Sequence, residues 1–340
     1  MAAFKTLPTR RLGNGPLVPR LGLGLMGFRG TYGQSFLSHE EMLEFLDEAY
    51  KRGERFWDTG GFQAICKQRK TILKLSQADE YGDSEAIIGK WFAANPGKRQ
   101  DIFLATKFGI VHTPTPPGFT MNSTPEYCRT AIEASLGRLG VPCVDLYYVH
   151  RLDKVTPVEK TMQVMVELKD AGKIKHIGLS ECSAESLRRA YAIHPITCVQ
   201  MEYSIFCTEI ESPQRKLLET ARELGEDISR LGDKRRILPW LQEGNIEQNV
   251  ALVNEIAALS RAKGVTTPQL ALAWLLAQGD DIFPIPGASK TQRLEENLKS
   301  LFISLSEEEE KKIRQLGEKV AGGRFQAMTG YDFADTPALE

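Results

Sequence analysis

The sequence predicts a parallel (β/α)8 barrel, a fold in which each strand is followed by a helix. Three observations predict it. Short apolar segments recur along the chain, helices with clear N-terminal caps stand between them, and hairpin turn signals between them are absent. Continuous apolar strands joined by helical crossovers form a parallel sheet that helices cover. At least seven such strands are present, which favours a closed barrel over an open sheet.

The predicted strands are apolar runs, and most of them stop at a residue that carries a polar or ionisable group. The first strand follows a polar opening with turn residues at 13–16. In chain order the strands are LGLGLMGF at 21–28, RFWD at 55–58, IFLATK at 102–107, VDLYYVH at 144–150, IKHIGLS at 174–180, CVQMEYS at 198–204 and DIFPIPG at 281–287.

Helix starts are marked by hydroxyl residues. Ser38 precedes apolar residues at helical spacing, and Glu41 three positions later completes a capping box. A Thr or Ser followed by Pro marks the other starts, because proline is favoured in the first helical turn. These pairs are Thr124 with Pro125, Thr156 with Pro157, where Glu159 completes a second box, Ser212 with Pro213, and Thr267 with Pro268.

An open, doubly wound sheet is the alternative fold, because Gly22, Gly24 and Gly27 spell GxGxxG. In a dinucleotide fingerprint a helix opens at the third glycine, so that its N-terminus meets the pyrophosphate. Residues 28–37 instead carry two more glycines and no helix cap. We therefore prefer the barrel.

The composition is that of an ordinary globular protein. The 340 residues are 42% hydrophobic and 26% charged, which argues against disorder or a fibrous repeat. The 43 Lys and Arg against 44 Asp and Glu leave no positive field for binding nucleic acid. No run approaches the ~20 apolar residues of a membrane helix. We expect a cytoplasmic protein with one domain over residues 1–340, its core at about 20–318 and a tail at 319–340.

The six cysteines are scattered without a CxxC pair. This pattern indicates neither a zinc site nor a disulfide framework, and we expect reduced thiols and no bound metal. The cysteines are Cys66, Cys128, Cys143, Cys182, Cys198 and Cys207.

Polar residues at the ends of the predicted strands form the candidate site. The carboxyl ends of the strands meet at one face of a barrel, where active sites of this fold lie. The residues expected to gather there are Asp58, Lys107, His150, Ser180 and Gln200, and Tyr81 lies in the loop after the strand that Asp58 ends.

Four of these residues suit the reduction of a carbonyl group. Hydride transfer to a carbonyl requires a proton for its oxygen, and a phenol such as Tyr81 is a poor acid unless a nearby cation favours its phenolate. Lys107 can supply that cation, and Asp58 the carboxylate that a buried ammonium needs. His150 can orient and polarise the carbonyl oxygen. Each residue taken singly also fits a structural role, as a buried ion pair, a strand-end histidine or a loop aromatic.

Here the chain resembles a known family, the aldo-keto reductases, along most of its length. The likeness is closest to the branch with pyridoxal reductases and related fungal enzymes. The matching segments are RLGNGPLVPRLGLGLMGF, FWDT, ADEYG with SEAIIGKW, IFLATKFG, SLGRLGVPCVDLYYVHR, GKIKHIGLSE, VQMEYS, TPQLALAWLLAQ and FPIPGASKTQRLEENL.

The resemblance implies an NADP(H)-dependent oxidoreductase that reduces a small aldehyde or ketone to an alcohol. It makes Asp58, Tyr81, Lys107 and His150 the catalytic tetrad, with Tyr81 as the general acid. It also implies that Ser180 and Gln200 bind the nicotinamide carboxamide. The alternative that we keep open is a relative without catalytic activity, a barrel that binds the cofactor or a partner protein.

The segment GASKTQRLEEN at 287–297 resembles the family's binding site for the adenosine end of NADPH. A glycine followed by a helix start offers backbone N–H groups to phosphate, and added cations suit a 2′-phosphate. NADP(H) is therefore expected rather than NAD. The expected cofactor-binding residues here are Gly287, Ser289, Lys290, Arg293 and Asn297.

The chain departs from the family between Asp58 and Tyr81, which are normally only a few residues apart. Joining residues 58–59 directly to 78–82 restores the family pattern, so the 18 residues at 60–77 are in excess. A retained intron is one explanation, because 18 codons preserve the reading frame. A genuine insertion into an active-site loop is the other.

A second departure follows Gly225, where the family has its seventh strand and a phosphate-binding loop. The apolar stretch RILPWL at 236–241 is a poor substitute, because Pro239 cannot donate to a sheet ladder. The sequence thus predicts a barrel that lacks the seventh strand and its loop. Such a gap would expose two facing strand edges, so we expect some rearrangement to fill it.

Overall fold

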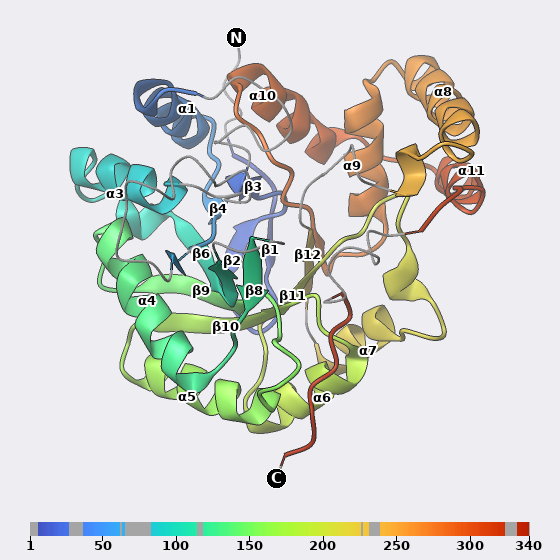
Figure 1. The fold of residues 1–340 in the computed structure, drawn as a ribbon. Helices are drawn as coiled ribbons and strands as arrows, with labels where there is room; N and C mark the ends of the chain where they lie inside the picture. Colours follow the sequence, from blue (N-terminus) through green and yellow to red (C-terminus); the bar gives the residue numbers. More distant parts are fainter. Residues whose placement is uncertain are drawn as a thin grey trace.

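Eight parallel strands form one curled sheet at the centre of the molecule (Figure 1). The structure is a computed structural model, and it describes residues 6–26, 37–61, 63–64, 83–113, 118–225, 227–230, 239–323 and 332–339. The strands are β3 Leu23–Gly24, β4 Phe56–Asp58, β6 Phe103–Phe108, β9 Val144–Val149, β10 Ile174–Ser180, β11 Cys198–Met201, β12 Asp227–Arg230 and β13 Ile282–Phe283. They neighbour one another in chain order, as a barrel requires.

Helices cover the outside of this sheet (Figure 1). Their apolar faces pack on the strands and build the larger core cluster, which includes Trp57 and Trp274. The helices are α1 His39–Lys51, α3 Ser84–Ala94, α4 Pro125–Leu139, α5 Val158–Asp170, α6 Ala184–Ile193, α7 Leu217–Leu224, α8 Ile246–Lys263, α9 Thr267–Ala277, α10 Thr291–Lys299 and α11 Glu307–Gly317.

The first strand and the chain after the last strand close the barrel. The amides of Gly22 and Gly24 donate to the carbonyls of Pro284 and Pro286, at 2.9 and 3.1 Å. A Cβ at Gly24 would lie 2.8 Å from the carbonyl oxygen of Ile285, so only glycine permits this approach. Gly22 and Gly24 therefore serve barrel closure, which confirms the preference for the barrel, while Gly27 lies outside the described residues.

The polar opening segment closes the amino end of the barrel. β1 Thr9–Arg11 and β2 Leu17–Pro19 pair as an antiparallel hairpin. Leu12 and Val18 from this hairpin join a second core cluster inside the barrel, with aromatic residues such as Phe56 and Phe283. The amino end of the barrel is thus filled with apolar side chains. The polar residues that end the strands lie at the opposite, carboxyl end.

The expectation that the seventh strand is missing is wrong. β12 lies between β11 and β13 and pairs in parallel with both of them. It begins two residues after Gly225, whose left-handed backbone (φ 73°) ends α7. An open gap would leave backbone groups of both neighbours without partners, so the segment 227–230 takes the vacant place although it is not an apolar run. The expectation that the phosphate loop is also missing concerns the chain after this strand, and residues 231–238 lie outside the described residues.

The predicted helix starts are partly confirmed. Ser38 with Glu41 forms the expected capping box, and Thr124 caps α4 with Pro125 as its first residue. α9 is capped one residue earlier than expected, by Thr266 with Gln269.

Two of the predicted caps are wrong, one because the Glu159 side chain has a tertiary partner and one because the helix begins further along the chain. Glu159 forms no capping box and instead binds Arg189 through two bonds of 2.7 and 2.9 Å. Ser212 accepts from the amide of Arg215, but α7 begins only at Leu217.

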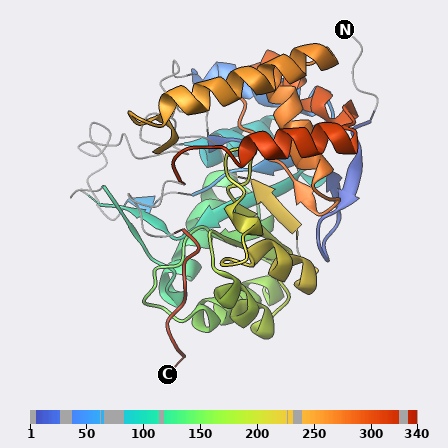
Figure 2. The same cartoon turned by 90° about the vertical axis from the view of Figure 1, so that its right-hand side faces the viewer.

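A small second sheet stands at the carboxyl end of the barrel, opposite the β1–β2 hairpin (Figure 2). β5 Gln63–Ala64 pairs with β7 Ile110–His112, which pairs with β8 Phe119–Met121. β5 belongs to the predicted insertion at 60–77. Of this insertion the structure describes residues 60–61 and 63–64, and residue 62 and residues 65–77 lie outside the described residues.

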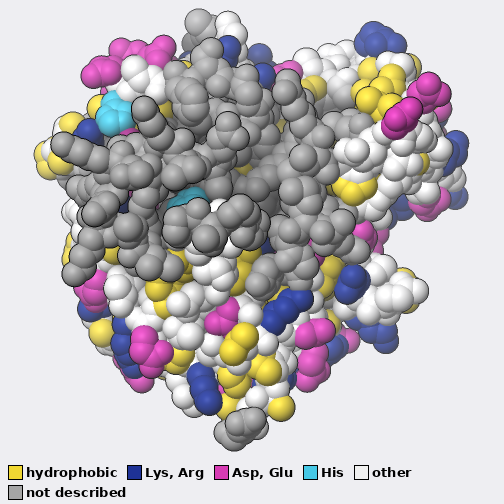
Figure 3. Space-filling view, in the orientation of Figure 1, with side chains coloured by type: hydrophobic (Ala, Val, Ile, Leu, Met, Phe, Trp, Pro, Cys, Tyr) yellow, Lys and Arg dark blue, Asp and Glu magenta, His cyan; other side chains and the backbone are white. Residues whose placement is uncertain are grey.

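The described part of the surface agrees with the nearly balanced charge of the sequence. Basic and acidic side chains are interspersed over the described area of the face in Figure 3 and form no single basic patch. Among the described helices none is long and apolar enough to cross a bilayer. The described residues also contain no cluster of three or more His, Cys, Asp or Glu side chains placed to hold a metal ion.

The position of β12 can be tested with proline. Ile228 stands opposite Val199 on one side and Ile282 on the other. Ile228→Pro should remove a ladder donor and lower the free energy of unfolding by on the order of 3 kcal/mol, measured by urea denaturation. Ile228→Val is the control and should change it by less than about 1.5 kcal/mol. A proline variant as stable as the parent would show that 227–230 is not a central strand.

Candidate active site

A buried ion pair lies at the carboxyl end of two neighbouring strands. Asp58 ends β4, and Lys107 is in β6, whose residue Ala105 stands opposite Asp58. Each side chain is 2% exposed or less, and the Lys107 ammonium donates to Oδ1 of Asp58. The expectation that these two residues meet is therefore confirmed.

Further groups complete the hydrogen bonding of this pair. Lys107 Nζ donates to the backbone carbonyl of Thr59 at 2.7 Å and lies 5.7 Å from the centroid of the Tyr148 ring. Oδ2 of Asp58 accepts from Nε2 of Gln200 at 3.0 Å. The pair thus has partners on both charged groups, which a buried ion pair requires.

Burial acts on both members of the pair. It raises the pKa of the Asp58 carboxyl group above its usual value and lowers the pKa of the Lys107 ammonium, and in each case the opposite charge of the partner works against the shift. The lysine charge therefore depends on Asp58.

His150 follows β9 directly and is 5% exposed. Its amide donates to the carbonyl of Phe108 at 2.7 Å, which fixes the backbone beside Lys107. Burial, and then the positive charges of Arg151 and Lys107, hold the pKa of the imidazole well below its usual range. The ring is neutral at pH 7, so one nitrogen can donate a hydrogen bond without carrying a charge.

Tyr81 lies outside the described residues. The structure does describe the residues around its loop. The hydroxyl groups of Thr59 and Ser84, both buried, are 2.7 Å apart, and Ser84 is the first residue of α3. The chain before the insertion and the chain after Tyr81 are therefore joined directly beside Lys107.

Ser180 and Gln200 reach the same place from β10 and β11, where they stand opposite each other in the parallel pairing. Ser180 accepts from Nη1 of Arg151 at 3.2 Å. Glu181 follows with a left-handed backbone (φ 54°), an uncommon conformation for a residue other than glycine. Its carboxylate accepts from the amide of Glu202 at 3.1 Å.

The predicted cofactor segment lies around the start of α10. Gly287 bridges Gly24 across the barrel closure. Lys290 precedes the helix and Arg293 is in its first turn; both side chains are exposed, and neither has an ion-pair partner among the described residues. Ser289 is half-buried beside them, whereas Asn297 is buried one turn further on.

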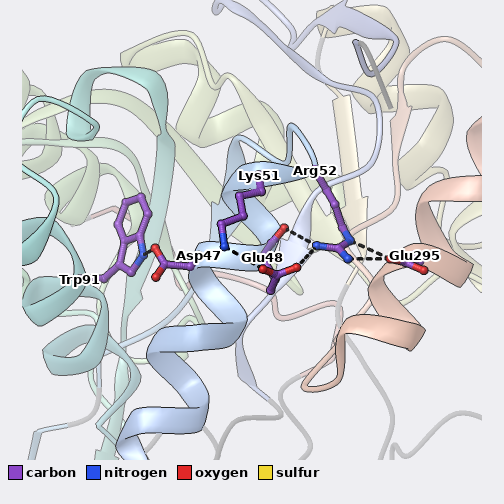
Figure 4. A network of polar contacts seen from close by, with 6 residues as sticks. All are labelled: Asp47, Glu48, Lys51, Arg52, Trp91 and Glu295. Atoms are coloured by element: carbon purple, nitrogen blue, oxygen red, sulfur yellow. Dashed lines mark hydrogen bonds and ion pairs between the residues drawn. The ribbon is translucent and has the colours of Figure 1, made fainter. Parts of the chain in front are cut away.

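A network of ion pairs holds α10 in place (Figure 4). Arg52, at the end of α1, donates to Glu295 of α10 at 2.6 and 3.0 Å. Asp47 of α1 accepts from the indole nitrogen of Trp91 in α3 at 2.8 Å. The two helices beside the predicted cofactor segment and the Tyr81 loop are thus both tied to α1.

The sequence reading missed the role of the tail. The backbone of Ala334 accepts from Ser183 at 3.1 Å and donates to Glu181 at 2.8 Å, next to Ser180. Arg189 donates to the carbonyls of Thr336 and Pro337 at 3.2 and 2.7 Å. These are backbone contacts, and the only signal in the sequence was the aromatic residues of the tail. Of these, Phe333 is buried, while Phe325 and Tyr331 lie outside the described residues.

The buried pair should be more costly to break than to remove. Lys107→Met leaves Asp58 buried without its cation and should lower the free energy of unfolding by about 3–5 kcal/mol. The double variant Asp58→Asn/Lys107→Met should lower it less than Lys107→Met alone. Urea denaturation at pH 7, followed by circular dichroism, measures both values.

The matched control is the surface pair of Lys263 and Glu309, which meet at 2.8 Å with side chains 23% and 38% exposed. Lys263→Met there should cost about 1 kcal/mol or less. The single variant Asp58→Asn completes the comparison. If Asp58→Asn/Lys107→Met loses as much free energy of unfolding as Asp58→Asn and Lys107→Met do when their losses are added, Asp58 and Lys107 do not depend on each other.

Known proteins with the same fold and a similar sequence place the site in a family. The sequence pattern of the Aldo/keto reductase family matches residues 20–318. The aldo-keto reductase yakc [NADP(+)] of Schizosaccharomyces pombe is 40% identical, and the alignment covers 98% of this chain and 99% of that protein. Aldo-keto reductase str7 of Strobilurus tenacellus is 41% identical over 98% of this chain and 99% of its own length.

Solved structures agree. A thermostable aldo-keto reductase, Tm1743, in complex with the inhibitor epalrestat has a TM-score of 0.71 and 30% identity, over 91% of this chain and 100% of its own. The glycerol dehydrogenase AKR11B4 of Gluconobacter oxydans has a TM-score of 0.74 over 97% and 98% of the two chains and, at 21% identity, supports the fold alone. The same holds for an aldo-keto reductase of Klebsiella pneumoniae in complex with NADPH, with a TM-score of 0.68, 22% identity and 91% and 95% coverage. The chain therefore belongs to the aldo-keto reductase family.

Proposed function

We propose that this oxidoreductase uses NADP(H) to reduce the carbonyl group of an aldehyde or ketone to an alcohol. The observation that carries the proposal is the buried pair of Lys107 and Asp58 at the carboxyl end of the barrel. A buried ion pair adds little stability to a barrel core, because taking two charges out of water costs free energy. We therefore attribute this pair to catalysis. His150, neutral and buried beside the pair, supplies the second polar group that a carbonyl oxygen needs.

The residues present fit a nicotinamide cofactor. Oε1 of Gln200 is buried and has no hydrogen-bond partner among the described residues, so it can accept from an amide group of a ligand. Lys290 and Arg293 stand exposed at the N-terminus of α10, where backbone N–H groups also favour an anion. The Schizosaccharomyces pombe relative carries NADP(+) in its name, which supports the same cofactor here.

When bound, the nicotinamide supplies a hydride for the carbonyl carbon. The chain's own residues act on the oxygen. The Lys107 charge favours the phenolate of Tyr81 and so makes the phenol a better acid, and Asp58 keeps that charge in place. His150 donates a hydrogen bond to the same oxygen, and Tyr81 transfers its proton as charge develops.

We further propose that residues 20–318 act as one barrel domain with the tail at 319–340, and that the protein works in the cytoplasm.

Oxidation of NADPH at 340 nm with a panel of aliphatic and aromatic aldehydes and ketones tests the function. Tight NADPH binding without turnover of any carbonyl would favour the second candidate, a barrel that binds the cofactor without catalysis.

The role of Tyr81 has a specific signature. Tyr81→Phe should lower kcat/KM for carbonyl reduction by roughly two to four powers of ten, because it removes the proton donor. The dissociation constant for NADPH, measured by quenching of protein fluorescence, should change little. Equal activity of the variant and the parent would refute the assignment.

Arg293 should distinguish the two cofactors. A guanidinium can bind a phosphate with two hydrogen bonds. Arg293→Ala should therefore weaken the binding of NADPH by roughly ten- to a hundredfold and the binding of NADH much less. Titration of both cofactors measures the ratio. Arg261→Ala, a change near the end of α8, is the matched control and should affect neither. Equal weakening of NADPH and NADH would show that Arg293 does not bind the 2′-phosphate.

A further inference from the structure

A buried carboxylate lies in the layer between the barrel and its helices. Glu85, in the first turn of α3, is 2% exposed. Its Oε1 accepts from the hydroxyl of Thr106 at 2.6 Å, and its Oε2 accepts from Nε of Arg138, in the last turn of α4, at 2.7 Å. Successive side chains of a strand point to opposite faces, so Thr106 faces the helices and Lys107, the next residue of β6, faces the inside of the barrel. Glu85 thus ties two helices to the strand that carries Lys107.

The start of α3 is bound a second time, at the neighbouring strand. Ser84, the first residue of α3, shares a hydrogen bond of 2.7 Å with Thr59, which follows β4. Ser84 and Glu85 therefore bind the ends of both strands that supply the buried ion pair. Tyr81 is only three residues before Ser84 in the sequence. These contacts consequently fix the point at which the chain from Tyr81 joins the barrel.

The bonds of Glu85 are directional, unlike the contacts around them. The rest of the buried face of α3 is largely apolar, with Ile87, Ile88 and Trp91. Hydrophobic attraction has no preferred direction, whereas a buried charge must keep its hydrogen bonds. A shift of α3 along β6 would leave the carboxylate without a donor, which is costly. Glu85 therefore specifies one register of α3 on β6.

Glu85 also affects Lys107 through its charge. Burial lowers the pKa of the Lys107 ammonium, and the negative charge of Asp58 opposes this shift most strongly. Glu85 acts in the same direction as Asp58. Its position therefore matters to the cation as well as to the helix.

The predicted insertion begins against the same side chains. The amide of Gly61 donates to the carbonyl of Lys107 at 3.1 Å. A Cβ at this position would lie 2.7 Å from Nη2 of Arg138, 2.8 Å from Oγ of Ser135 and 3.1 Å from Oε2 of Glu85. A larger residue at position 61 would therefore push Arg138 away from Glu85.

We propose that Glu85 is a positioning residue that, through Thr106 and Arg138, holds the start of α3 in one register against the strand of Lys107. The inference rests on the proposed function, in which Tyr81 and Lys107 act on the same carbonyl oxygen. Glu85 itself touches neither the substrate nor the cofactor. Its effect is on the distance between the two groups that do the chemistry.

Glu85→Gln tests the role of the carboxylate, because glutamine keeps the size of the side chain and removes the charge that binds Arg138. With a carbonyl compound that the parent reduces, kcat should fall roughly ten- to a hundredfold, since a misplacement of about 1 Å can cost a hundredfold in rate. KM and the dissociation constant for NADPH should each change by less than about threefold, because the lost interaction is one that favours the transition state only.

Thr106 provides a conservative pair of variants. Thr106→Val keeps the shape of the side chain and removes the hydroxyl, so kcat should fall about tenfold. Thr106→Ser keeps the hydroxyl and should retain most of the activity. Equal kcat values for the valine and serine variants would show that the hydrogen bond to Glu85 has no role.

Gly61→Ala disturbs the same contacts without removing a polar group, and it should also lower kcat. Gly137→Ala is its control, because Gly137 is exposed on α4 and an added Cβ there meets nothing within 4 Å. The control should have the kcat of the parent. If Gly61→Ala has it too, contact with Arg138 does not matter for catalysis.

Asp145→Asn is the matched control for Glu85→Gln. Asp145 is a second buried carboxylate bound to β6, where it accepts from the amide of Leu104 at 3.0 Å, and it pairs with Arg99 at 2.7 Å. Its bond lies near the beginning of β6, away from Lys107. Asp145→Asn should therefore lower the free energy of unfolding but leave kcat unchanged. Circular dichroism confirms that each variant is folded.

Crystal structures of the two variants give a measurement that does not depend on turnover. The 2.7 Å contact between Thr59 and Ser84 should lengthen in Glu85→Gln and persist in Asp145→Asn. If that contact is unchanged in Glu85→Gln, or if Glu85→Gln lowers kcat no more than Asp145→Asn does, the inference is wrong. If the parent reduces no carbonyl compound, the proposed function is wrong, and the crystal structures still decide whether Glu85 positions α3.

Discussion

The arrangement of the carboxyl end of the barrel depends on one buried charge. An ammonium group inside a protein must have both a counter-charge and hydrogen-bond acceptors, and Lys107 obtains them from Asp58 and the carbonyl of Thr59. These requirements bring the end of β4 against β6. They also orient Gln200, since the second oxygen of Asp58 accepts from its amide. Hydrogen bonds thus connect Lys107 in β6 through Asp58 in β4 to Gln200 in β11.

The closed barrel makes this arrangement rigid. Parallel strands pair along the whole ring, so the carboxyl ends of β4, β6, β9, β10 and β11 are held in register. The same demand for backbone partners explains β12, because a gap between β11 and β13 would leave two strand edges unpaired. The chain fills this place with DISR, a segment that has neither the apolar run nor the alternation expected for such a strand.

The tail adds a constraint from outside the ring. It bonds through its backbone to Glu181 and Ser183, while Arg189 binds two of its carbonyls and is itself held by Glu159. Glu181, which has a left-handed backbone, lies in the segment that the tail contacts. Strained residues persist where the surroundings hold them, and here the tail contributes to that hold next to Ser180.

The sequence by itself determined the parallel barrel, the order of its strands and the residues that end them, because hydrophobic runs, helix caps and strand-end polar groups are local signals. It also predicted that Asp58 and Lys107 would meet, since a buried cation needs a carboxylate. Only the tertiary structure decided the seventh strand, the pairing of Arg189 with Glu159, the docking of the tail and the orientation of Gln200. These features depend on partners far apart in the sequence. A strand such as β12 forms because its neighbours' backbone groups need partners. Its own residues therefore give little indication that it will be a strand.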